Sequence, residues 1–166
     1  MKYYILSLLI TLSGIASAEK INSKEYRFKL TVPGKMVEVK DTSDALPGNI
    51  FFDTSAGIVL IISARESKFR SVNEYLDCKQ EKLELQLQTV YNDTSLRLVN
   101  CSRSRYYSRK TTVLHFSGTA GIYNSSVIYF IHHRNKDIQI SFTYRKEKEK
   151  SCLPYIDAVM RTLKLK

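Results

Sequence analysis

The segment CSRSRYYSRK, residues 101–110, holds the densest set of side chains that could do chemistry. In an extended chain, alternate residues share a face, which would place Arg103, Arg105 and Arg109 on one side. A guanidinium group binds a carboxylate or a phosphate through two parallel hydrogen bonds. We therefore predict a docking surface for an acidic protein partner, made of Arg103, Arg105, Tyr107, Arg109 and Lys110.

The same segment has other interpretations. Cationic side chains protect an edge strand from aggregation, and this role needs no partner. An anionic glycan or membrane surface would also attract a chain with a net charge of +10, although such a charge also serves solubility alone. Nucleic acid is disfavoured, because an exported domain rarely meets it and the aromatic residues lack the arrangement of an RNA-binding sheet.

The histidines do not form an evident catalytic set. His132 and His133 are adjacent, so on a strand their side chains point to opposite faces. His115 alternates with apolar neighbours, which is typical of a structural histidine, and the chain has no Gly-x-Ser-x-Gly motif. We expect no catalytic residue, and we keep a small secreted hydrolase that uses His115 as the alternative function.

The cysteines indicate a disulfide rather than a metal site. Their spacing fits no zinc motif, and the acidic residues are too sparse for a calcium loop. We expect neither a metal nor another cofactor. In an oxidising compartment, three cysteines predict one disulfide and one remaining thiol, and the sequence leaves open every pairing among Cys78, Cys101 and Cys152.

The N-terminal residues 1–18 have the pattern of a signal peptide. Lys2 precedes an apolar run over residues 5–15, and Ala16-Ser17-Ala18 provides small residues for cleavage before Glu19. The run is short for a membrane span, which needs about 20 residues; a retained N-terminal anchor is the alternative. We predict a secreted or periplasmic protein whose residues 19–166 form a single domain with no transmembrane segment. If the host is eukaryotic, N-glycosylation acceptors stand at Asn92, Asn100 and Asn124.

Hydrophobic periodicity predicts mostly strands with two helices. Alternating or apolar runs indicate strands near residues 26–32, 35–39, 50–52, 58–62, 96–101, 113–116, 127–131 and 138–144. A capping box at Ser71–Glu74 opens a helix over residues 72–89, and Ser151 is expected to cap a last helix with Pro154 in its first turn. The order predicts an α+β fold, with a mostly antiparallel sheet on which the internal and C-terminal helices pack.

Several stretches resemble proteins of the PsbP-like fold. These are the opening YRFKLTVPGK, the helix region ESKFRSVNEYLDCKQEKL, the closing hairpin VIYFIHHRNKDIQISFTY and the final VMRTLKLK. The chain departs from the pattern in having no tryptophan after the first Pro-turn, and LKLK where Ser-x-Phe is usual. The resemblance implies an α/β/α-like sandwich without shared catalytic residues. Such domains bind or adapt other proteins in photosynthetic complexes, the bacterial periplasm and secretion systems. We therefore expect a non-enzymatic inhibitor, immunity factor or assembly adaptor.

Overall fold

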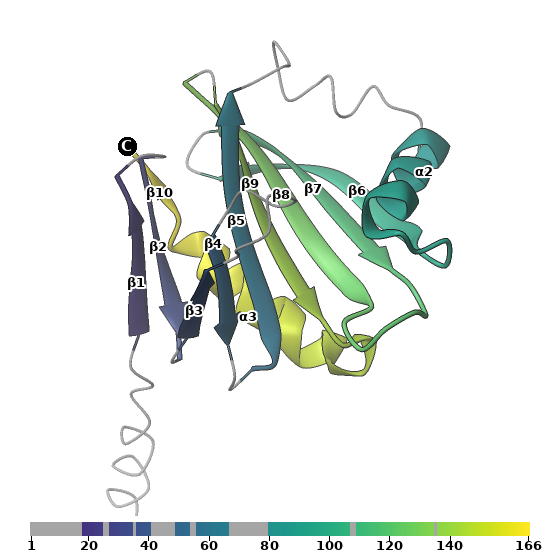
Figure 1. Cartoon of the computed structure of the whole chain (residues 1–166). Helices are drawn as coiled ribbons and strands as arrows, with labels where there is room; N and C mark the ends of the chain where they lie inside the picture. Colours follow the sequence, from purple (N-terminus) through teal and green to yellow (C-terminus); the bar gives the residue numbers. More distant parts are fainter. Residues whose placement is uncertain are drawn as a thin grey trace, which may run out of the picture.

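The computed structural model describes residues 18–24, 27–34, 36–40, 49–53, 56–66, 80–106, 109–134 and 136–166. In these ranges the chain forms a small and a large antiparallel sheet with two α-helices (Figure 1). The predicted α+β architecture with a mostly antiparallel sheet is confirmed. None of the helices in these ranges is long and apolar enough to cross a membrane.

The small sheet has the strand order β1-β2-β10, with β1 spanning Ala18–Ser23, β2 Phe28–Pro33 and β10 Lys164–Leu165. Along β2, burial alternates as the sequence pattern predicts: Phe28, Leu30 and Val32 are buried, whereas Lys29 is exposed. The strands β1 and β10 were not predicted. β1 is mostly polar and β10 has only two residues, so neither carries a readable alternation.

The large sheet has the strand order β3-β4-β5-β9-β8-β7-β6. Every neighbouring pair in it is antiparallel. The central pairing joins β5 to β9, which are far apart in the sequence. Its strands are β3 (Met36–Lys40), β4 (Asn49–Asp53), β5 (Ile58–Glu66), β6 (Arg97–Tyr106), β7 (Arg109–Ser117), β8 (Ser125–His133) and β9 (Lys136–Tyr144).

The two helices cover opposite faces of the large sheet, and strand β8 shows this directly. Val127, Tyr129 and Ile131 belong to the core that contains α3 (Glu149–Arg161), whereas Ile128 belongs to the core beneath α2 (Gln80–Tyr91). Since alternate residues of a strand face opposite sides, α3 and α2 lie on opposite faces. This is the sandwich that the sequence implied, with α2 beside β6 and α3 across the other face (Figure 1).

The start of the C-terminal helix differs from the prediction. A 3-10 turn over Lys146–Lys148 leads directly into α3, so the helix begins at Glu149, with Lys148 as its N-cap residue and no capping side chain. Ser151 lies within the first turn, where its hydroxyl donates to the Lys148 carbonyl at 2.9 Å. A helical serine can make this backward bond as readily as a cap. Pro154 lies further inside the helix. The predicted capping box at Ser71–Glu74 lies outside the described residues.

Candidate functional site

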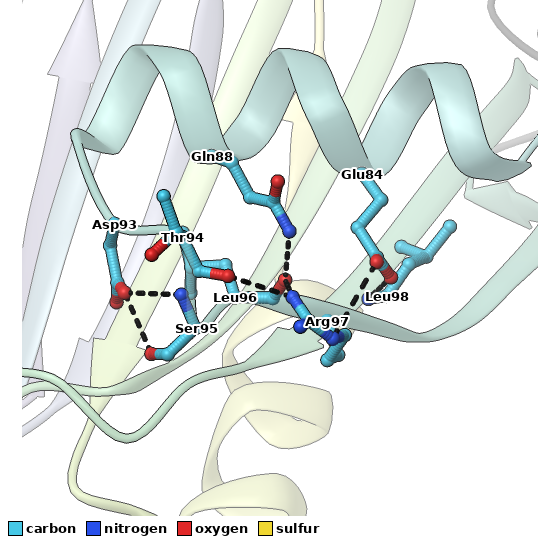
Figure 2. Close-up of polar contacts among 8 residues, drawn as sticks. All are labelled: Glu84, Gln88, Asp93, Thr94, Ser95, Leu96, Arg97 and Leu98. Carbon is cyan, nitrogen blue, oxygen red and sulfur yellow. Dashed lines mark hydrogen bonds and ion pairs between the residues drawn. The ribbon is translucent and has the colours of Figure 1, made fainter.

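The candidate site begins at the turn that connects α2 to the edge strand β6. Asn92 takes a left-handed backbone conformation with φ of 49°, which ends the helix. The Asp93 carboxylate then accepts hydrogen bonds from the Ser95 amide at 2.8 Å and from its hydroxyl at 2.7 Å (Figure 2). The Ser95 hydroxyl oxygen accepts a further bond from the Thr119 amide at 2.8 Å. The turn is thereby fixed to the loop between β7 and β8.

Side chains of α2 occupy the first part of the β6 edge. The Leu98 amide donates to the Glu84 carboxylate at 2.8 Å, and the Gln88 side-chain amide donates to the Leu96 carbonyl at 2.9 Å (Figure 2). Arg97 lies beside the same carboxylate, with its Nε 3.8 Å from a Glu84 oxygen. Because these backbone groups already have partners, they cannot pair with another strand.

Beyond this region, β6 carries the predicted cationic segment. Residues 101–106 are extended as predicted, and β6 is the last strand of the described sheet. The pairing with β7 places Arg105 opposite Lys110 and Arg103 opposite Thr112. Residues opposite each other in an antiparallel pair share a face. Positions 103, 105 and 110 therefore belong to one face of the sheet.

Arg109 does not continue this face. Tyr106 pairs with Arg109, so the chain reverses direction between them. Arg109 therefore shares a face with Tyr106 and lies on the other face from Arg105. The prediction of one face that includes Arg109 is therefore wrong, because it assumed a single extended run. Tyr107 lies outside the described residues.

The shared face is the one that α2 covers further along the strands. Leu114 of β7 packs in the core beneath α2, and position 110 has the same alternation as Leu114. On the same face of β8 and β9, His132 Nδ1 lies 3.0 Å from Asp137 Oδ1. The second Asp137 oxygen is buried and has no hydrogen-bond partner among the described residues. Arg65 of β5 stands opposite Asp137 in the strand register. Sequence analysis missed both Arg65 and the His–Asp pair. The His–Asp pair depends on the register of the β8–β9 hairpin, and Arg65 joins it only through the long-range pairing of β5 with β9.

His115 lies on the other face, in a cluster with Tyr144 and Glu149. Its Nε2 is 3.1 Å from the Tyr144 hydroxyl and 4.0 Å from a Glu149 oxygen. Burial lowers the pKa of His115, and the Glu149 carboxylate only partly opposes this effect. Burial, with Glu149 and Cys152 nearby, raises the pKa of the Tyr144 hydroxyl, which therefore stays protonated. The cluster connects β7 and β9 to the first turn of α3, which favours a structural role for His115.

The cysteines occupy different environments. Cys152 is a free thiol in the core beneath α3, and burial raises its pKa. The two pairings that include Cys152 are therefore not formed in this structure. Cys101 is exposed on β6, and Cys78 lies outside the described residues. Within the ranges that the structure describes, no group of acidic, histidine and cysteine side chains could hold a metal ion.

Comparison with known proteins gives matches only at the level of structure. No protein-family model matches the sequence, and no curated protein is similar to it in sequence. Among solved structures, the cyanobacterial PsbP (CyanoP) of Synechocystis sp. PCC 6803 is similar with a TM-score of 0.73 and 14% identity, over 93% of this chain and 95% of that chain.

Two further structures are similar with lower scores. A Bacteroides thetaiotaomicron VPI-5482 protein matches with a TM-score of 0.56 and 17% identity, over 89% of this chain but only 48% of its own. A Pseudomonas aeruginosa protein of unknown function matches with a TM-score of 0.54 and 12% identity, over 90% of this chain and 97% of that chain. At such identities the likeness concerns the fold alone, and at that level the resemblance predicted from the sequence is confirmed: the chain has a PsbP-like fold.

Proposed function

We propose that this chain is an exported, non-enzymatic binding protein that docks on an acidic protein partner. The docking surface is the cationic end of the large sheet. We define it by positions Arg103, Arg105 and Lys110 on β6 and β7, and by Arg65 on β5, three strands away from β7. The observation that carries the proposal is the register of β6 and β7, which places Arg105 opposite Lys110 on the edge of the sheet. Cations at opposed positions of a strand pair repel, so a partner that supplies carboxylates would offset this repulsion.

The position of this surface suits protein recognition. Gln88 and Glu84 of α2 bond to the backbone at Leu96 and Leu98, and the cationic positions lie further along the same edge strand. Arginine side chains there supply paired hydrogen bonds to carboxylates, and their charge accelerates the encounter with an acidic surface. The partner class follows from this chemistry. An inhibitor, an immunity factor or an assembly adaptor would each use such a surface.

Export is the second part of the proposal. Residues 1–18 have the composition of a signal peptide, and removal before Glu19 leaves residues 19–166 as one domain. The Glu19 carboxylate accepts a hydrogen bond from the Met36 amide at 3.0 Å. Cleavage at this point keeps that contact, which attaches β1 to the start of β3.

Charge reversal on the two faces of the hairpin tests the docking surface. Arg105→Glu reverses a charge on the proposed face. Arg109→Glu makes the same charge change on the other face of the sheet and serves as the control. The purified protein is used to capture partners from an extract of the source organism, and captured proteins are identified by mass spectrometry. We expect Arg105→Glu to lose an acidic partner that Arg109→Glu retains. Equal capture by both variants, or equal loss, would refute the assignment of this face.

A further inference from the structure

A second cationic surface lies on the small sheet, at a distance from the first. Lys29 of β2 is exposed and stands opposite Lys164 of β10 and Asn22 of β1. Lys20 stands opposite Thr31, and Thr31 and Lys29 are alternate residues of β2, so Lys20 and Lys29 lie on the same face of the small sheet. These positions point away from the core, since Phe28, Leu30 and Ile21 on the alternate set pack inward. The outer face of the small sheet therefore presents Lys20, Lys29 and Lys164.

Two more lysines join this face at its edge. The Lys166 amide donates to the Arg27 carbonyl at 2.8 Å, which holds the C-terminal residue beside the turn between β1 and β2. The pKa of Lys166 is lowered by loss of solvation, by the neighbouring Lys29 and by Lys24. We call the set of Lys20, Lys24, Lys29, Lys164 and Lys166 the lysine face.

No side-chain carboxylate forms an ion pair with these lysines in the described part of the chain. The ion pairs found there involve other side chains, and each of the five lysines is exposed. Glu19 belongs to the same face of β1 as the inward-packing Ile21, and its carboxylate accepts a hydrogen bond from the Met36 amide. Like charges directly opposite on neighbouring strands oppose folding. The pair of Lys29 and Lys164 therefore has a cost that a bound anion would offset.

We propose that the lysine face binds the phosphate headgroups of an anionic lipid bilayer. Lysine ammonium groups are strongly hydrated point charges that do not form the planar paired bonds of arginine. They suit a surface on which many phosphate charges are spread, and each contributes about fivefold to binding at an anionic bilayer.

The position of the face in the chain favours a bilayer over a soluble polyanion. The apolar run over residues 5–15 ends just before β1, and a residue spans at most about 3.6 Å. Before cleavage, a bilayer that holds this run therefore lies within reach of Lys20. The small sheet and β6 stand at opposite sides of the molecule (Figure 1), so this inference does not depend on the proposed protein partner.

Co-sedimentation with lipid vesicles tests the inference. The purified protein is mixed with vesicles of phosphatidylglycerol and phosphatidylcholine, and with vesicles of phosphatidylcholine alone. We expect binding only to the anionic vesicles, with loss of binding at high salt, because screening shortens electrostatic attraction to about 3 Å at 1 M salt. Lys164→Glu should weaken binding about tenfold or more, because it removes one cation and adds an anion. Lys150→Glu, at an exposed position near the start of α3, makes the same change in net charge and should keep most of the binding.

Thermal unfolding separates this effect from misfolding. Lys164→Glu converts the like-charged pair with Lys29 into an opposite-charged pair, so its melting temperature should be unchanged or higher. Weaker vesicle binding together with an undiminished melting temperature supports the proposal. Equal binding to both kinds of vesicle, or equal loss in the Lys150→Glu variant, would overturn it. Release by inorganic phosphate at constant ionic strength would indicate a site for free phosphate, and retention on heparin without vesicle binding would indicate a glycan; either result also overturns it.

Discussion

The contact between α2 and the edge of β6 gives the sharpest prediction about stability. Glu84→Ala removes the carboxylate that accepts the Leu98 amide at 2.8 Å, so this hydrogen bond between α2 and the edge strand is lost. A hydrogen bond to a charged group contributes about 1.5–3 kcal/mol. The ion pair with Arg97 adds little, since Arg97 is 62% exposed and its Nε lies 3.8 Å away. We expect Glu84→Ala to lower the free energy of unfolding by about 2 kcal/mol.

Urea unfolding, followed by circular dichroism, measures this change. For a domain of this size, about 2 kcal/mol corresponds to a fall of about 4–8 °C in melting temperature. Glu81→Ala is the matched control, because Glu81 is an exposed carboxylate in the first turn of the same helix. Its loss should cost no more than about 1 kcal/mol, through the helix dipole. If both substitutions destabilise the protein equally, the carboxylate does not support the edge strand and the reasoning fails.

Two further predictions concern buried groups. Burial lowers the pKa of His115 from its ordinary value of 6.5, so the unfolded chain takes up a proton at His115 more readily than the folded protein does. The free energy of unfolding should therefore fall as the pH drops below about 6.5. Urea unfolding at several pH values should show a weaker pH dependence for His115→Gln. Cys152 is buried and its thiol pKa is raised, so it should resist alkylation until the protein is denatured. Mass spectrometry of tryptic peptides measures this protection, and rapid alkylation of Cys152 in the native protein would contradict the structure.

The sequence predicts those elements whose burial alternates locally. β2 and β9 have apolar residues at every second position, and the alternation of Lys29 between Phe28 and Leu30 is reproduced in their burial. The small sheet could not be predicted as a sheet. β10 has two residues, and its pairing with β2 joins chain segments about as far apart as the sequence allows. Periodicity carries no information about such long-range pairing.

The candidate site was predicted only in part for a similar reason. The extended conformation of residues 101–106 follows from alternation. The pairing of Tyr106 with Arg109 then reverses the chain, and the sequence has no Gly, Pro or Asn there to indicate a turn. Without the turn, the register of β6 against β7 is unknown. The prediction missed this reversal and therefore assigned Arg109 to the wrong face of the sheet. The His132–Asp137 pair forms within the hairpin of β8 and β9, and the pairing of β7 with β8 places it on the face of Lys110. Arg65 could not be placed there until β5 was paired with β9.

The two cationic surfaces differ in chemistry as well as in position. The large sheet presents arginines on an edge strand whose first part is already bonded to α2, which favours a defined partner with carboxylates. The small sheet presents lysines on an open outer face, which favours a surface of diffuse negative charge. Because the core beneath α3 includes residues of β2 and of the large sheet, the two surfaces belong to one rigid framework. Together, the two proposals describe a chain that would hold an acidic protein at an anionic surface, and each of the two sites can be tested separately.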